Sequence, residues 1–270
     1  MLAYLDEKEK KCLSLRDLFL SFGGITVLND LSMDIFEGEL LALIGPNGAG
    51  KTSLLNCISG FYHPQRGEVF FQDRNISSFN SVKRFKIGIS RTFQNMELYN
   101  GLSVLDNLLS ARESMMTYGI VAAGLYFGKA RRQEIVHRDV IEDIIHILEL
   151  EAIRKSVVGN LPYGLRKRVD LGRALASKPK LLLLDEPMTG MNTEEKEDMV
   201  RYILDIRELW NTTIVIIEHD MGVIMDISDR VIVLDFGTKV AEGSPGVIKN
   251  NPRVIKAYLG MEEAQKGYGV

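Results

Sequence analysis

The sequence feature that most constrains the fold of this chain is a loop between a short apolar run and a segment of helical character. The loop, Gly45–Thr52, reads Gly-Pro-Asn-Gly-Ala-Gly-Lys-Thr and matches the pattern G-x-x-x-x-G-K-[ST]. It follows the run Leu40–Ile44, which predicts a buried strand, and leads into Lys51–Ser59, which predicts a helix. Glycines at this spacing let backbone amides turn toward an anion, and the start of the helix adds its dipole. The sequence therefore predicts a phosphate-binding loop.

The polar residues of this loop predict a site for Mg-ATP. Lys51 is placed to neutralise the β and γ phosphates, and the hydroxyl of Thr52 is placed to ligate Mg²⁺. A glycine-rich turn that matches by chance is the alternative, and the flanking strand and helix disfavour it. The predicted nucleotide-binding residues of the loop are Gly45, Pro46, Asn47, Gly48, Ala49, Gly50, Lys51, Thr52 and Ser53.

A second apolar strand ends in two adjacent carboxylates. The run Leu181–Leu184 is followed by Asp185 and Glu186, whose side chains strand alternation directs to different sides. We expect Asp185 to hold Mg²⁺, and Glu186 to orient the attacking water and accept its proton. Taken alone, such a pair more often marks a solvated strand end. The phosphate-binding loop makes the nucleotide-binding interpretation the better one.

The order of apolar patterns predicts an α/β fold. Alternating strand-like and helical segments indicate a mainly parallel sheet with helices on both faces and ligands at the carboxyl ends of its strands. A long helical insertion interrupts this order between Ser103 and Leu150. Further strands are expected at Leu13–Leu20, Leu31–Phe36, Glu68–Gln72, Ile87–Phe93 and Thr213–Ile217, and further helices at Gly164–Ala176 and Thr193–Trp210.

Composition narrows the functional classes. A net charge of -3 gives no electrostatic reason to expect a nucleic-acid partner. The amino terminus lacks the basic flank and apolar run of a secretory signal, and the two cysteines lack neighbours at metal-binding spacing, so we expect a cytoplasmic protein. The longest loosely apolar stretch, Met115–Phe127, is shorter than the roughly 20 residues that a membrane-spanning helix needs.

These motifs together resemble the ATP-binding cassette (ABC) family, and within it the ATPase subunits of branched-chain amino acid importers. The subgroup resemblance rests on the long helical insertion and on three short sequences: Arg-Thr-Phe-Gln-Asn at 91–95, Thr-Gly-Met-Asn at 189–192, and Asn-Asn-Pro-Arg-Val-Ile-Lys-Ala-Tyr-Leu-Gly at 250–260. It implies a P-loop NTPase (RecA-like) core with an antiparallel β subdomain and an inserted helical subdomain. The expected divisions are the core at 1–95 and 160–260, the insertion at 96–159, and a flexible tail at 261–270.

The resemblance also implies roles for three further residues. Phe22 matches the aromatic residue on which the family stacks adenine, and Gln94 matches the glutamine that touches Mg²⁺ and the attacking water. His219 matches the switch histidine that bonds the γ-phosphate. The expected catalytic residues are therefore Glu186, His219 and Gln94, and the expected Mg²⁺ ligands are Thr52, Gln94 and Asp185.

One family motif departs from its usual form. The signature Leu-Ser-Gly-Gly-Gln, which in the family clamps the γ-phosphate held by a partner ATPase, here reads Leu161-Pro162-Tyr163-Gly164-Leu165. Proline supplies neither a hydroxyl nor an N–H. Gly164, the helix dipole and the downstream Arg168 and Arg173 remain to support binding.

The implied function is an ATP-hydrolysing importer subunit on the inner face of the cell membrane. Its expected partners are a second ATPase subunit, in a hetero- or homodimer, and transmembrane permease subunits that dock on the insertion. Met115–Phe127 fits either internal packing or a permease contact. Alternatives are transport of urea or amides, lipid export, a soluble cassette switch acting on ribosomes or DNA, and a regulatory cassette that binds ATP without hydrolysing it.

Overall fold

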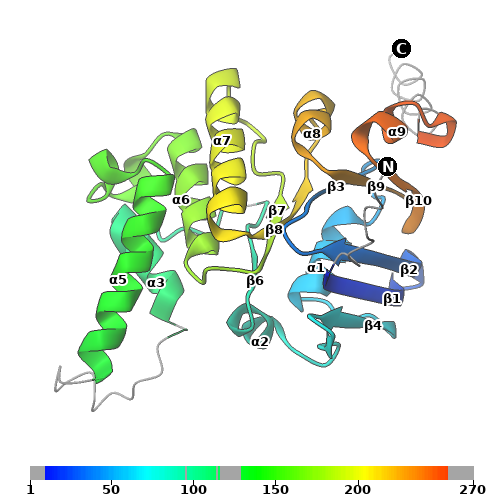
Figure 1. Cartoon of the computed structure of the whole chain (residues 1–270), viewed down its shortest axis with the longest axis horizontal. Helices are drawn as coiled ribbons and strands as arrows, with labels where there is room; N and C mark the ends of the chain where they lie inside the picture. Colours follow the sequence, from blue (N-terminus) through cyan, green and yellow to red (C-terminus); the bar gives the residue numbers. More distant parts are fainter. Residues whose placement is uncertain (1–9, 95, 114, 116–128, 255–270) are drawn as a thin grey trace, which may run out of the picture.

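The computed structural model describes residues 10–94, 96–113, 115 and 129–254, and Figure 1 shows their arrangement. The strands are β1 (Lys11–Phe22), β2 (Ile25–Phe36), β3 (Leu40–Ile44), β4 (Arg66–Phe71), β5 (Arg74–Asn75), β6 (Ile89–Arg91), β7 (Leu181–Asp185), β8 (Thr213–Ile217), β9 (Arg230–Asp235) and β10 (Thr238–Gly243). The α-helices are α1 (Lys51–Ser59), α2 (Ser81–Lys86), α3 (Val104–Glu113), α5 (Lys129–Ile147), α6 (Tyr163–Leu175), α7 (Thr193–Trp210), α8 (Met221–Ile227) and α9 (Pro245–Lys249). Two short 3₁₀ helices are η1 (Glu151–Ile153) and η2 (Val158–Asn160).

The central sheet has six strands in the order β10-β9-β3-β8-β7-β6. All neighbouring pairs from β9 to β6 are parallel, and β10 runs antiparallel to β9. The strand before the phosphate-binding loop, β3, therefore lies between β9 and β8, in the interior of the sheet. This order brings the carboxyl ends of β3, β8, β7 and β6 to one edge, where parallel α/β sheets bind their ligands.

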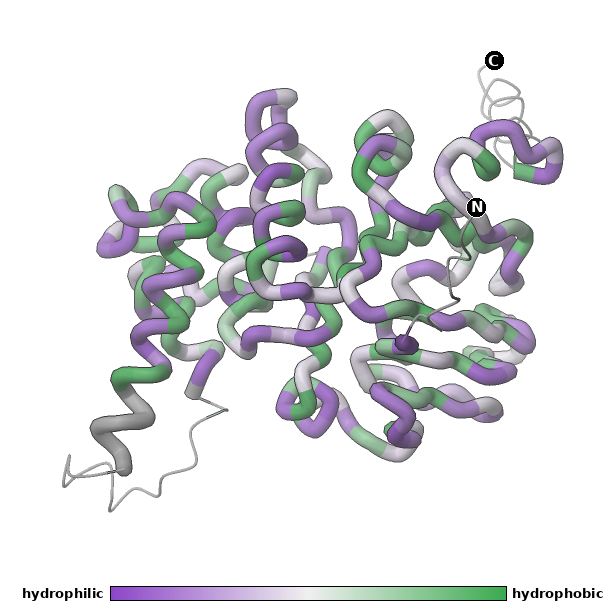
Figure 2. The backbone as a smooth tube through the Cα atoms, in the orientation of Figure 1, coloured by the Kyte–Doolittle hydropathy of each residue, from purple (hydrophilic) through white to green (hydrophobic). Residues whose placement is uncertain are grey.

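Both faces of this sheet are buried, which explains why its strands are continuous apolar runs. In β3, Leu40, Ala42 and Ile44 point to one hydrophobic core, while Leu41 and Leu43 point to the other. The first core lies under the helices α3, α5, α6, α7, α8 and α9. The second core joins α1 to the four-stranded antiparallel sheet β2-β1-β4-β5. Figure 2 shows the apolar character of the central strands along the backbone.

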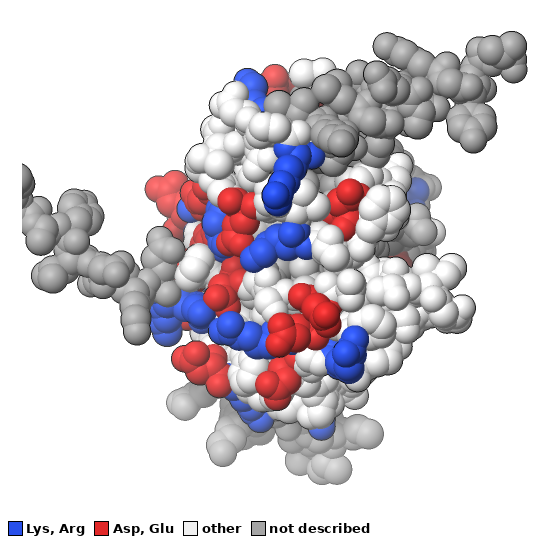
Figure 3. All heavy atoms as spheres, turned by 90° about the vertical axis from the view of Figure 1, so that its right-hand side faces the viewer, with Lys and Arg blue, Asp and Glu red and all other residues white. Residues whose placement is uncertain are grey.

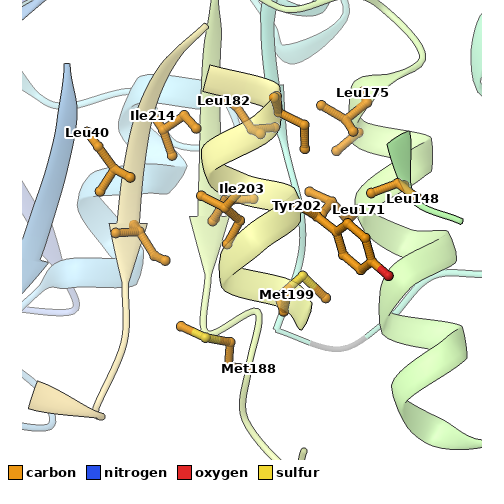
Figure 4. Close-up of a cluster of buried hydrophobic side chains, with 14 of the residues drawn as sticks. Leu40, Leu148, Leu171, Leu175, Leu182, Met188, Met199, Tyr202, Ile203 and Ile214 are labelled. Atoms are coloured by element: carbon orange, nitrogen blue, oxygen red, sulfur yellow. The ribbon is translucent and has the colours of Figure 1, made fainter. Parts of the chain in front are cut away.

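Helix α7 connects the central sheet to the helical part of the molecule. Figure 4 shows Ile203 of α7 on the side of the helix toward the sheet residues Leu182 and Ile214. On its other side, Tyr202 lies near Leu171 of α6, and all of these side chains are fully or almost fully buried. Because α6 in turn contacts α3 and α5, the sheet and the helical segment share one continuous core.

The sequence predicted α7 and β8 with the bounds observed, and these expectations are confirmed. β6 is shorter than the strand predicted at Ile87–Phe93, since it covers only Ile89–Arg91. Within the predicted insertion at 96–159, the described residues form α3, α5, η1 and η2. Most of Met115–Phe127 and the whole of the predicted tail at 261–270 lie outside the described residues.

In the described ranges, no helix is both long and apolar enough to cross a membrane. The face shown in Figure 3 carries acidic and basic side chains side by side. Examples of such pairing in the antiparallel sheet are Lys11 with Asp34 at 2.8 Å and Arg66 with Asp30 at 3.9 Å.

Candidate functional site

The loop Gly45–Thr52 packs tightly against neighbouring strands, β9 of the central sheet and β2 of the antiparallel sheet. Gly45 has a φ of 148°, and a side chain there would place its Cβ 2.1 Å from the carbonyl oxygen of Leu234. At Gly50, with a φ of 95°, a Cβ would lie 2.7 Å from the carbonyl oxygen of Val27. Both positions therefore require glycine, for conformation and for space. Gly50 is also the residue before α1, so the loop leads directly into the positive end of this helix.

Lys51 folds back over the loop. Its ammonium group donates to the carbonyl oxygens of Gly45 at 2.7 Å and Pro46 at 2.9 Å. Burial lowers the pKa of Lys51, while the nearby carboxylates of Glu186 and Asp185 oppose that shift. A phosphate group at the loop would supply the anion that this partly desolvated cation lacks.

Asp185 ends β7 in a buried position beside the loop. The hydroxyl of Thr52 donates to Oδ1 of Asp185 at 3.3 Å, and Nη2 of Arg91 donates to Oδ2 at 2.9 Å. Burial raises the pKa of Asp185, and the positive charge of Arg91 counteracts this shift. The structure thus brings together two of the three predicted Mg²⁺ ligands, Thr52 and Asp185, from different parts of the chain.

The carboxylate of Glu186 has other partners than that of Asp185. Its Oε1 lies 2.8 Å from Nε2 of His219, and its Oε2 accepts from Nε2 of Gln94 at 3.1 Å. Thr189 donates to the same Oε2 at 3.4 Å. Glu186 itself has a φ of 52°, a left-handed conformation that is uncommon for a residue with a side chain. The three residues predicted to be catalytic therefore form one hydrogen-bonded group.

Two opposing effects set the charge of Glu186. Partial burial acts to raise its pKa, but the hydrogen bonds from His219, Gln94 and Thr189 outweigh burial, and the pKa is lowered overall. An ionised carboxylate can accept a proton from water, as a general base must. The side-chain amide of Gln94 donates to Glu186, whereas the other two predicted ligands, Thr52 and Asp185, bond to each other. The contact of Gln94 with Mg²⁺ therefore stays a prediction.

Phe22 is exposed enough to meet a ligand, with 47% of its surface accessible. Its ring packs edge-to-face against Tyr62, with the ring centroids 5.1 Å apart. Tyr62 follows α1, so this aromatic pair joins the end of β1 to the segment after the loop helix. The pair offers a surface on which a planar base can stack.

Pro162 occupies the position before α6, and no side chain caps this helix start. Gly164 is buried there, and a Cβ on it would lie 2.1 Å from Oε1 of Glu195. The two arginines expected to support phosphate binding point elsewhere: Arg168 pairs with Asp198 at 3.3 Å, and Arg173 donates to the carbonyl oxygen of Glu97.

Three residues at the site were not anticipated from the sequence. Arg91 binds Asp185, and Tyr62 packs against Phe22. Glu218 is buried beside His219 and accepts from the backbone N–H groups of Met188 at 2.6 Å and His219 at 3.1 Å. A carboxylate directly after the apolar strand β8 is the signal that points to Glu218. Arg91 and Tyr62 carry no comparable local signal.

Comparisons with known proteins agree with this geometry. The ABC transporter family model matches residues 28–189, and a model described as branched-chain amino acid ATP-binding cassette transporter matches residues 238–263. The high-affinity branched-chain amino acid transport ATP-binding protein LivG of Escherichia coli is 36% identical over 92% of this chain and 97% of its own length. The corresponding protein BraF of Pseudomonas aeruginosa is also 36% identical, with the same two coverages.

Solved structures give the same result. A nucleotide-free ATP-binding cassette from an ABC transporter is 28% identical, covers 92% of this chain and 98% of its own, and superposes with a TM-score of 0.79. The ADP conformation of a cassette is 28% identical, covers 93% and 99%, and has a TM-score of 0.80. Sequence and fold agree over nearly the whole length, and the chain belongs to the ABC transporter family as an ATP-binding and ATP-hydrolysing subunit of the branched-chain amino acid cassette group.

Proposed function

We propose that this chain hydrolyses Mg-ATP to drive the import of branched-chain or similar amino acids through permease subunits. The observation that carries the proposal is the meeting of Glu186, His219 and Gln94 in one hydrogen-bonded group at the sheet edge that holds the phosphate-binding loop. The relatives LivG and BraF, both named as branched-chain amino acid transport proteins, support this class of transported solute. The chain would act at the inner face of the cell membrane, held there by its permease partners.

The residues beside the loop suit Mg²⁺. A hydroxyl from Thr52 and a carboxylate from Asp185, 3.3 Å apart, are the hard oxygen ligands that Mg²⁺ prefers, and nucleotide phosphates and water complete such sites. When bound, the ion would neutralise charge on the phosphates. Lys51 would hold the β and γ phosphates, and Ser53 and the loop amides would surround them.

Glu186 would act as the general base. Its lowered pKa keeps it ionised at neutral pH, and its Oε2 lies beside the amide of Gln94, which would orient the attacking water. His219 lies 2.8 Å from the other oxygen and would turn to the γ-phosphate when nucleotide is bound. Phe22 and Tyr62 would stack the adenine.

We also propose a second ATPase subunit as partner, either a copy of this chain or a different one. The start of α6 at Pro162–Gly164 would face the nucleotide of that partner, and the exposed ring of Tyr163 stands at this position. Because Pro162 supplies no hydroxyl, the partner's nucleotide would be held less firmly than by the family's usual serine.

A permease segment would dock where the core meets the helical segment. A cavity of about 310 Å³ lies there, lined by Phe85 of α2, Phe93 after β6, and Asp170 and Arg173 of α6. Gln94 directly follows Phe93 in the chain, so a change at the γ-phosphate would reach the cavity wall through adjacent backbone. Nucleotide state would then alter hydrogen exchange between Gln94 and Leu150 in the assembled transporter.

The decisive experiment is to purify the native complex from membranes, identify its other subunits, and measure which solute stimulates ATP hydrolysis. Stimulation by leucine, isoleucine or valine would support the proposal. Stimulation by urea or an amide would keep the importer but replace its substrate. Recovery of the chain with ribosomes or DNA and without a permease would contradict it.

A further inference from the structure

The side chain of Arg91 lies between the candidate nucleotide site and the cavity beside α6. It is 5% exposed, and its ionic partner Asp185 is fully buried. Nη2 donates to Oδ2 of Asp185 at 2.9 Å, and Nη1 donates to Oδ1 of Asn56 on α1 at 2.5 Å. One guanidinium therefore joins the end of β7 to the helix that follows the phosphate-binding loop.

These contacts fix the orientation of the Asp185 carboxylate. Arg91 binds Oδ2, which leaves Oδ1 directed at the hydroxyl of Thr52, 3.3 Å away. A charge-assisted hydrogen bond of this kind holds geometry more strictly than a neutral one. Arg91 also compensates the buried charge of Asp185, which would otherwise be costly to keep ionised in the absence of another cation.

On its other side, Arg91 forms part of the cavity wall. Its guanidinium carbon lies 4.9 Å from the centroid of the Phe93 ring, which meets Phe61 edge-to-face at 5.3 Å. All three residues line the cavity of about 310 Å³, together with Asp170 and Arg173. A shift of the guanidinium at Asp185 would therefore also alter its contact with the Phe93 ring.

We propose that Arg91 is a positioning residue that orients Asp185 toward the Mg²⁺ of the nucleotide and transmits the occupancy of that site to the cavity wall. The proposal rests on the proposed function for its Mg²⁺ site and deepens it, because it names the contact through which site and cavity communicate. Linkage makes the effect reciprocal: an occupant of the cavity that moves Phe93 alters the affinity of the Mg²⁺ site by the same factor.

The first test measures how much Mg²⁺ strengthens ADP binding to the purified full-length chain. The ratio of the dissociation constant in EDTA to that in Mg²⁺ is compared among wild type, Arg91→Met and Arg91→Lys. Both variants are expected to lower the ratio about tenfold or more. Methionine removes the charge of Arg91, and the shorter ammonium of lysine cannot bind Asp185 and Asn56 together. The matched control is Arg84→Lys, which alters a buried guanidinium bound to the carbonyl oxygens of Cys57 and Ile58 at the end of the same helix.

The outcomes separate three roles of Arg91. A lower ratio in both Arg91 variants, with the ratio of Arg84→Lys unchanged, supports positioning. An unchanged ratio, or an equal loss in the control, shows that Arg91 acts only on the fold and overturns the proposal. A raised ratio in Arg91→Met shows that Arg91 merely repels the bound cation, which also overturns it.

The second test measures transmission to the cavity by hydrogen exchange. In wild type, ADP with Mg²⁺ is expected to change the protection of residues 89–93 and 170–174 relative to ADP in EDTA, and Arg91→Met is expected to remove this difference. No difference in wild type would overturn the transmission. Neither test uses a permease, so failure to find an import partner leaves both results intact, whereas a chain that fails to bind ADP at all contradicts the proposed function instead.

Discussion

Nε2 of His219 lies 2.8 Å from Oε1 of Glu186, although the two residues are 33 positions apart in the chain. They follow the neighbouring parallel strands β8 and β7, whose carboxyl ends the sheet aligns. Gln94, which follows the next strand β6, holds the other oxygen of the same carboxylate. The strand order thus assembles an imidazole, a carboxylate and an amide around the position proposed for the attacking water.

Glu186→Gln is expected to retain ATP binding and to lose hydrolysis by about 100-fold or more, because the amide keeps the shape but cannot accept a proton. Steady-state turnover and equilibrium binding of ATP measure the two effects separately. Turnover within a few-fold of wild type would show that Glu186 is not the base.

Lys51→Ala is expected to abolish productive nucleotide binding. The ammonium donates to the carbonyl oxygens of Gly45 and Pro46 and would face the phosphates of a bound nucleotide, where backbone amides alone cannot replace its charge. Equilibrium binding of ADP and ATP checks this result, with Lys196→Ala, a lysine that pairs with Asp220, as the control. Near-normal turnover of the Lys51 variant would refute the assigned loop.

Pro162→Ser is expected to raise the ATP turnover of the isolated chain about tenfold or more, because serine restores one hydroxyl to the clamp on the partner's phosphate. Pro162→Ala is the matched control, since it removes the ring without adding a hydroxyl. Turnover is measured for wild type and Pro162→Ser, each alone and with the partner ATPase subunit. Equal rates in these four samples would show that Pro162 is functionally silent.

Asp170→Asn is expected to stabilise the chain at pH 7.5 and to leave its stability at pH 4 nearly unchanged. Burial raises the pKa of Asp170 to about 6 from an ordinary value of 3.8, so the folded state binds more protons than the unfolded state between these values. The stabilisation that the neutral form of Asp170 contributes to the fold is therefore fully present below pH 3.8 and is lost as the pH rises through 6. Between the two ends of this pH range, the contribution of Asp170 to the free energy of unfolding changes by about 3 kcal/mol.

Thermal unfolding between pH 4 and pH 8 measures this effect. The melting temperature of wild type is expected to fall relative to that of Asp170→Asn as the pH rises from 4 to 7. The control Asp205→Asn removes the same charge from a half-buried position on α7 and corrects for the change of net charge. Parallel curves for wild type and Asp170→Asn would show that Asp170 keeps an ordinary pKa.

The sequence predicted those parts of the fold that depend on local pattern. α7 has the predicted bounds because Asn192 caps its start and a buried stripe including Met199 and Ile203 runs along one face. The strand β9 was not predicted, although its continuous apolar run Val231–Leu234 is of the same kind as the runs that predicted β3 and β7. The strand β5 has only two residues, Arg74 and Asn75, which are too few to show a period.

The sequence by itself determined the phosphate-binding loop, because glycine spacing, Lys51 and the following helix act within one short segment. It also identified both carboxylates at the end of β7. Only the tertiary structure decided the partners of these residues: Arg91 for Asp185, 94 positions away, and His219 for Glu186. Such pairs depend on which strands become neighbours in the sheet, and strand order is set by the packing of both sheet faces against helices distant in sequence.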